Sequence, residues 1–276
     1  MKLQERDFKV LEALERWGVM GLGQVDGLLF HKEVSGEERA RLFFNDIRRE
    51  DYWGRAYKRL GGLEKLGLVR VQRSDYTWPV YLLTARGFEL LRRRGKTRYE
   101  TPSQGISERL VRHEIATVGV GLVLTEVLGL GVNTARETWD WMGKKYGRRS
   151  QEARLTMPDF LVGKAGGDVE HIVEVELTPK SRRRYAEIFR SHQSRLPDHR
   201  TSKILYIAGW PGGVGHLMRL GHRFEVSAIQ AAQLSDFRAK LGRCEFAPSY
   251  YPGTPFVLTN NETPADSLDV EQEVAR

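Results

Sequence analysis

The chain of 276 residues contains a single cysteine, Cys244, which excludes disulfides within the chain and zinc sites built from several cysteines. It has no apolar run of about 18 residues, so we expect no transmembrane helix and no membrane partner. The first residues lack the apolar core of a signal peptide, which favours a cytoplasmic protein. The glycine-rich segment 209–215 lacks the Gly-Lys-Ser/Thr ending of a phosphate loop, and we expect no organic cofactor.

Positive charge is in excess. Lys and Arg number 44 against 36 Asp and Glu, giving a net charge of +8 and a pI of about 9.6. Polyanions are therefore the favoured partners. The length allows two modest domains or one large one, and the apolar fraction of 40% is ordinary for a globular protein.

The first half has a pattern of helices followed by a hairpin. Helical spacing predicts helices over residues 5–17, 19–30 and 52–66, with a charged insertion at 31–50 between the second and the third. Strands are expected at 68–71 and 80–83, joined by a loop at 74–79, and a closing helix begins at 84. This order is typical of a winged helix-turn-helix domain, which we expect over residues 1–98.

Basic residues cluster on or beside three of these elements. We therefore expect double-stranded DNA as the partner. The third helix would read base edges and the hairpin would contact phosphates. The residues assigned to DNA are Arg55, Lys58 and Arg59 on the third helix, Arg70 and Arg73 on the hairpin, and Arg92, Arg93 and Arg94 after the closing helix. Two alternatives stay open: these residues are ordinary solvated charges, or the winged helix contacts a protein.

The segment 99–107 is rich in Pro, Gly and Ser and is the expected linker. Beyond it we expect a helix at 107–128, a strand at 132–141, two acidic strands, a basic helix at 180–195 and a continuous apolar strand at 203–208. A helix at 212–220 and a short strand at 224–226 follow. Continuous strands between helices favour a sheet covered on both faces. We expect an αβββαβ domain over 107–245, a disordered acidic tail over 246–276, and an α/β or α+β fold overall.

The two acidic strands carry the most informative residues of the chain. The run 157–162 contains Asp159, and the run 171–177 alternates Glu174 and Glu176 with apolar residues. Side chains alternate between the faces of a strand, so the two glutamates share one face, and a hairpin would bring Asp159 toward them. Converging carboxylates with Lys180 beyond them suggest a Mg²⁺ site for phosphodiester chemistry. The alternative is a solvated strand face.

Pro158-Asp159, then Glu174-Val175-Glu176 and Lys180, resemble the motif of the PD-(D/E)XK nuclease superfamily. A winged helix joined to such a domain resembles the plasmid replication-relaxation family, over roughly residues 5 to 230. The resemblance implies a restriction-endonuclease-like domain with Asp159 and Glu174 as metal ligands. The superfamily's lysine lies two positions after the second acid, where this chain has Glu176, so the lysine's role would move to Lys180.

The resemblance thus implies a catalytic set of Asp159, Glu174, Glu176 and Lys180 with Mg²⁺, for which Mn²⁺ could substitute. Arg182, Arg183 and Arg184 would line the DNA path. The implied protein binds DNA of a plasmid or other mobile element and acts in replication, relaxation or transposition, with replication or mobilisation proteins or a second copy of itself as further partners. The alternative is a winged-helix transcriptional regulator or recruiter whose second domain is catalytically inactive.

Overall fold

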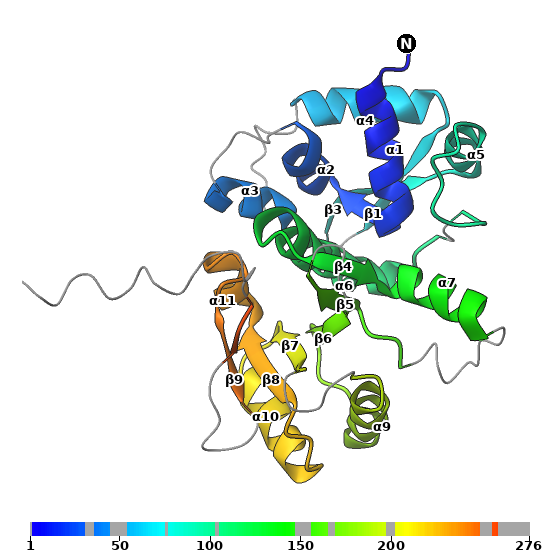
Figure 1. The fold of residues 1–276 in the computed structure, drawn as a ribbon. Coiled ribbons are helices and arrows are strands. Elements are labelled where there is room, and N and C mark those ends of the chain that lie inside the picture. The colour runs from blue at the N-terminus through cyan, green and yellow to red at the C-terminus, as the bar shows by residue number, and fades with distance from the viewer. Residues whose placement is uncertain are drawn as a thin grey trace, which may run out of the picture.

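The structure is a computed structural model, shown in Figure 1. It describes residues 2–30, 36–44, 54–74, 77–102, 105–146, 156–164, 169–196, 202–248 and 256–258. The chain is a mixture of α-helices and β-strands that form two sheets, one in each half.

The first half builds a three-stranded antiparallel sheet in the order β1-β3-β2, surrounded by helices. Helix α1 ends where Gly18 adopts a φ of +78°, a left-handed conformation that favours glycine. The elements are α1 Glu5–Trp17, β1 Val19–Gly21, α2 Leu22–Leu29, α3 Gly36–Phe43, α4 Arg55–Lys65, β2 Val69–Ser74, β3 Thr77–Leu83 and α5 Ala85–Arg93.

Several expected boundaries in this half were wrong. The helix expected at 19–30 begins with strand β1, because Val19, Met20 and Gly21 pair with the end of β3. The loop expected at 74–79 is shorter, since β3 already begins at Thr77. The charged insertion contains helix α3, whose Phe43 is fully buried.

The second half builds a seven-stranded sheet in the order β10-β9-β8-β7-β6-β5-β4. Strands β4, β5 and β6 are antiparallel neighbours, whereas β6, β7 and β8 run parallel. The helices are α6 Glu108–Leu122, continued by a π-helical turn at Val123–Val127, then α7 Ala135–Tyr146, α9 Arg182–Gln193, α10 Gly213–Arg223 and α11 Leu234–Ala239. The strands are β4 Gly131–Thr134, β5 Phe160–Gly163, β6 Val169–Glu176, β7 Ile204–Ala208, β8 Ile229–Gln233, β9 Glu245–Pro248 and β10 Phe256–Val257.

Three expectations for this half need correction. The strand expected at 132–141 ends at Thr134, where Thr134 and Glu137 exchange hydrogen bonds and start helix α7. The strand expected at 224–226 is a turn in which Glu225 has a φ of +57°, and β8 follows it. The sheet also extends past residue 245: Phe246 is fully buried, and β10 falls inside the stretch expected to be a disordered tail. Residues 259–276 lie outside the described part.

Both faces of the seven-stranded sheet are covered, as expected from its apolar strands. On one face Tyr185 and Phe189 of α9 and Leu217 of α10 pack on β6 and β7. On the other face α6 packs on Val173 and Val175. Figure 1 shows α6 crossing the middle of the molecule, between the first half and this sheet.

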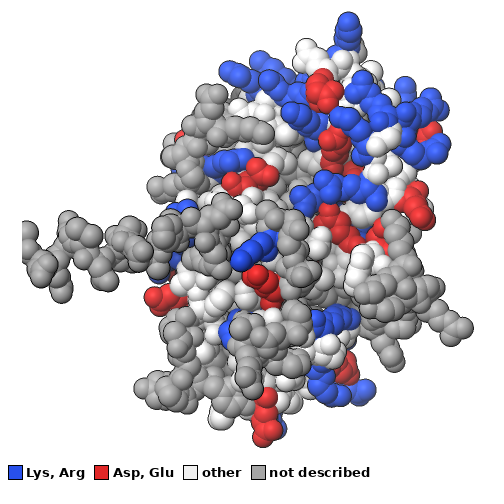
Figure 2. All heavy atoms as spheres, viewed as in Figure 1, with Lys and Arg blue, Asp and Glu red and all other residues white. Residues whose placement is uncertain are grey.

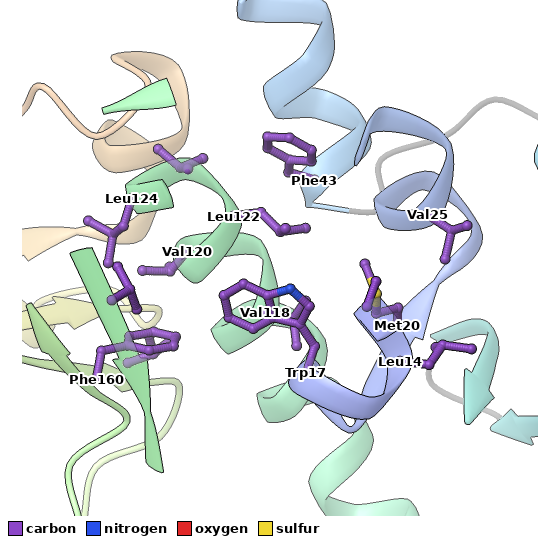
Figure 3. Close-up of a cluster of buried hydrophobic side chains, with 14 of the residues drawn as sticks. Leu14, Trp17, Met20, Val25, Phe43, Val118, Val120, Leu122, Leu124 and Phe160 are labelled. Carbon is purple, nitrogen blue, oxygen red and sulfur yellow. The ribbon is translucent and has the colours of Figure 1, made fainter. Parts of the chain in front are cut away.

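One cluster of buried side chains extends from the first half into the second. Trp17 of α1 meets Phe160 of β5 edge to face, with ring centroids 6.4 Å apart. Gly121 of α6 lies so close to both rings that an added Cβ would come within 2.5 Å of Trp17. Figure 3 shows these rings beside Val118 and Leu122 of the same helix. The expected domains 1–98 and 107–245 therefore share a core.

Hydrogen bonds also cross the expected linker. The buried carboxylate of Glu15 accepts from the backbone N–H groups of Arg98 and Tyr99, at 2.8 and 3.1 Å. Arg16 donates to Glu137 of α7 at 3.2 Å and to the carbonyl of Val132 at 2.7 Å. The start of the linker is thus fixed against α1. Among the described residues no helix combines the length and the apolar character needed to cross a membrane.

Candidate functional site

Strand β6 carries Glu174 and Glu176 on one face and Val173 and Val175 on the other, as the alternation predicted. The glutamates point toward α9, on the face where Ile172 packs. Glu174 is 8% exposed and Glu176 is 4% exposed. The alternative of a solvated strand face is therefore wrong, because both carboxylates are buried and need partners.

Asp159 lies beside Glu174 through the predicted hairpin. Strands β5 and β6 pair with Phe160 opposite Val173, which puts Asp159, one residue earlier, next to Glu174 on the same face. The Asp159 carboxylate accepts a hydrogen bond of 2.7 Å from the backbone N–H of Val175. It thereby satisfies a donor that β5, which begins only at Phe160, leaves without a strand partner.

His113 of α6 completes the same arrangement. Its Nε2–H donates to the Val175 carbonyl at 2.8 Å and lies 4.0 Å from Asp159 Oδ2. Asp159 and His113 thus bind the two backbone groups of Val175, the residue between the glutamates. His113 is not among the residues predicted from the sequence. The signal was present, because Arg109, Arg112 and His113 lie three and four residues apart on one side of a helix.

The electrostatics of the cluster favour the protonated forms of Asp159 and Glu176. Burial, together with the charge of Glu174, raises the pKa of Asp159 to about 8, against the opposing effects of His113 and the Val175 N–H. Burial also raises the pKa of Glu176, although Lys180 opposes it. Burial lowers the pKa of His113, but the charges of Asp159 and Glu114 and the hydrogen bond to Val175 outweigh it, so the net shift is upward. A cation bound between Asp159 and Glu174 would relieve the repulsion between their carboxylates.

Each glutamate has its own partner. Glu174 accepts a short hydrogen bond from Nε2 of His192, a fully buried residue of α9. Glu176 pairs with the ammonium group of Lys180, which follows β6 by four residues. The ammonium group of Lys180 therefore lies beside Glu176. Glu176 occupies the position at which the PD-(D/E)XK motif has its lysine.

All four predicted catalytic residues line one cleft of about 420 Å³. The donor set fits Mg²⁺ in kind, since Asp159, just before β5, and Glu174 on β6 offer neighbouring carboxylate oxygens. Within the described part of the chain, however, no three His, Cys, Asp or Glu side chains lie close enough together to hold a metal ion. The cleft wall also includes Arg109, Arg112 and His113 from α6, and Thr156, Met157 and Ile188.

The residues predicted to read DNA on the third helix differ in their environment. Arg55 and Lys58 of α4 are exposed. Arg59 instead forms a two-pronged ion pair with Asp7 of α1, whose side chain is fully buried. Because that pair holds the guanidinium against α1, Arg59 is not available to read bases.

The remaining predicted DNA contacts are also of two kinds. Arg70 and Arg73 of β2 and Arg182 of α9 are exposed. The others are exposed or half-buried and already paired with acids: Arg92 and Arg93 with Glu89, Arg94 with Glu5, and Arg183 and Arg184 with Glu187. Figure 2 shows Lys and Arg gathered around α1, α4 and α5 with Asp and Glu among them.

Comparison with protein-family models, curated proteins and solved structures gives no significant match to the chain.

Proposed function

We propose that the protein binds DNA of a plasmid or other mobile element and acts in its replication, relaxation or transposition, with a nuclease-like second half that cleaves DNA with Mg²⁺. One observation carries the proposal. Asp159 and Glu174 adjoin in the same cleft, within the element succession α6-β4-α7-β5-β6-α9-β7. Apart from helix α7, which is inserted between β4 and β5, that succession has two antiparallel pairings followed by a parallel one, the order expected of an αβββαβ nuclease domain.

The first half supports the DNA-binding part of the proposal. Apart from the additional helix α3, helices α1, α2 and α4 with a β1-β3-β2 sheet follow the element order of a winged helix-turn-helix. Arg55 and Lys58 stand exposed on α4, the helix that would enter the major groove. Arg70 and Arg73 stand exposed on β2, beside the wing, where they would contact phosphates.

The cleft residues have distinct roles in the proposed cleavage. Asp159 and Glu174 would hold Mg²⁺, which when bound polarises the scissile phosphate and lowers the pKa of an attacking water. Lys180 would stabilise the charge that develops on the phosphate, because its ammonium group already lies in the cleft at Glu176. His113 and His192 orient the ligands through Val175 and Glu174.

Nicking of supercoiled plasmid in Mg²⁺ or Mn²⁺ tests the activity. Wild-type protein should nick, Asp159→Ala should abolish nicking, and Lys180→Ala should slow it about 100-fold while Mn²⁺ affinity is retained. Both variants should keep their affinity for duplex DNA, measured by fluorescence anisotropy. Nicking by Asp159→Ala at the wild-type rate would assign the cleavage to a contaminant.

A second candidate is a winged-helix regulator or recruiter with an inactive second half. The observation that favours it is the commitment of Glu174 to His192 and of Glu176 to Lys180. Calorimetric titration with Mn²⁺ separates the two candidates. Binding that is lost in Glu174→Ala supports the nuclease, whereas DNA binding without any Mn²⁺ binding supports the regulator.

A further inference from the structure

Arg109 and Arg112 are not among the predicted DNA contacts. They differ in their ion pairing from most of the arginines that were predicted to contact DNA. Both are exposed on α6, and neither has an ion pair among the described residues. By contrast, Arg92 and Arg93 share ion pairs with Glu89, whose carboxylate offsets one of their two charges. Charge without an acidic partner is the charge that a phosphate can use, because no internal pair has to be broken first.

Helix α6 lies between the two sheets. Its residues Val111 and Ile115 pack on Val80 and Leu82 of the small sheet. Its residue His113 bonds to the backbone of β6 in the large sheet. The first turns of α6, which carry Arg109 and Arg112, therefore stand where the two halves meet.

The small sheet continues this basic surface on one side. The guanidinium of Arg70 on β2 lies against Gly105, where an added Cβ would be 2.7 Å from Nη2. Gln72 of the same strand donates a 3.1 Å hydrogen bond to the carbonyl of Ile106. Since Gly105 and Ile106 lead directly into α6, Arg70 lies near the start of that helix.

The acidic cleft lies on the other side. Arg109 and Arg112 form part of its wall, together with Asp159 and Lys180. In their ionised forms, in which they would bind a metal, the cleft carboxylates repel a phosphate that approaches the cleft. Cations at the mouth offset this repulsion before the phosphate meets Asp159.

We propose that Arg109 and Arg112 bind the phosphate backbone of duplex DNA and join the winged helix to the acidic cleft in one continuous surface. This surface, the α6 bridge, runs from Arg70 through Arg109 and Arg112 to Lys180. It rests on the proposed DNA-binding function and deepens it: a single duplex contacts both halves, so the DNA held by the winged helix is the DNA presented to the cleft.

The test compares three variants of the 276-residue chain, of which two remove the same number of arginines. Arg109→Gln/Arg112→Gln removes the bridge, and Arg92→Gln/Arg93→Gln removes two arginines that already share ion pairs with Glu89. Anisotropy is measured over a range of salt with two duplexes, one of about 10 base pairs, a single helical turn, and one of about 30. The third variant, Arg109→Lys/Arg112→Lys, keeps the charge.

On the long duplex the bridge variant should lose affinity about tenfold, and its salt slope should fall by about 2, since each phosphate contact contributes about 0.9. The lysine variant should bind like wild type, and the Arg92/Arg93 variant should lower the slope by no more than about 1, because Glu89 already offsets one of its two charges. On the short duplex all proteins should bind alike. Equal losses in the two glutamine variants on the long duplex would overturn the bridge. Failure of the wild type to bind either duplex would instead overturn the proposed DNA-binding function.

Discussion

At the scale of single residues, Arg59 shows how a charge that suits DNA can serve the fold. Asp7 lies in the first turn of α1 with a fully buried side chain. A buried carboxylate requires a partner of opposite charge, and Arg59 supplies two donors to it. The sequence placed Arg55, Lys58 and Arg59 on one helix, but the neighbour of each depends on how α4 packs on α1.

Arg59→Ala should therefore act on stability, whereas its neighbours act on DNA. We expect Arg59→Ala to lower the free energy of unfolding by about 3 kcal/mol, because it leaves a buried carboxylate unpaired. Arg55→Ala should change it by less than about 0.5 kcal/mol. Urea unfolding measures both. Arg55→Glu/Lys58→Glu should weaken DNA binding with unfolding unchanged, and equal stability of the Arg59 and Arg55 variants would contradict this assignment.

Asp159 should give the metal-free protein an unusual pH dependence. Its pKa is about 8 in the folded state against an ordinary value of 3.8, so between these values the folded state holds a proton that the unfolded state has released. Stability is therefore full below about pH 4 and falls as the pH rises toward about 8. Asp159→Asn removes this loss and keeps an acceptor for Val175.

We expect Asp159→Asn to be more stable than wild type by on the order of 2 kcal/mol at about pH 8, with the difference shrinking toward about pH 5. Urea unfolding over this range checks the prediction. A constant difference across the range would show that another group causes it.

At the scale of elements, the sequence predicted regular strands better than element boundaries. The alternation in β6 predicted the face that holds Glu174 and Glu176, because burial imposes a period of two. Strand β1 was missed, because three apolar residues before a helix fit either structure. Helix α7 was taken for a strand, although Thr134 and Glu137 have the spacing of a capping box.

The site was predictable in part for the same reason. Asp159, Glu174 and Lys180 are close in sequence or joined by one hairpin. His113 and His192 come from helices whose docking on β6 no local pattern specifies. The role of His113 follows from its hydrogen bond to the backbone of Val175, and that of His192 from its hydrogen bond to the buried carboxylate of Glu174.

The link from α6 to β6 gives a prediction for His113. His113→Ala leaves the Val175 carbonyl without its partner, which should lower the free energy of unfolding by about 1–2 kcal/mol. It should also weaken Mn²⁺ binding about tenfold, because Val175 lies between Glu174 and Glu176. His113→Gln, whose amide can still donate, should recover part of the Mn²⁺ affinity in calorimetry. Identical Mn²⁺ affinity in the alanine and glutamine variants would exclude a positioning role.

At the scale of the whole molecule, the composition of the linker predicts two independent domains, whereas the packing of the core predicts one cooperative unit. Residues rich in Pro, Gly and Ser predict a turn, but composition does not reveal what covers it. In the structure Tyr99 is buried, and its N–H is bound by Glu15. Trp17 and Phe160 belong to one cluster, with α6 packed between the sheets. This shared packing favours one cooperative unit over two independent domains.

Leu91→Ala, a change in the first half, tests that cooperativity through its effect on the second half. Leu91 is fully buried in α5, which packs on α1 in the first half. Its loss should cost about 2–5 kcal/mol. If the protein unfolds as one unit, hydrogen exchange should speed up by the same factor in β3 of the first half and in β6 and β7 of the second. Faster exchange in β3 alone, with β6 and β7 unchanged, would show that the halves fold independently.

In that case limited proteolysis would also release two stable fragments by cutting within residues 99–107. Each half would stay folded without the side chains that the other half packs against it.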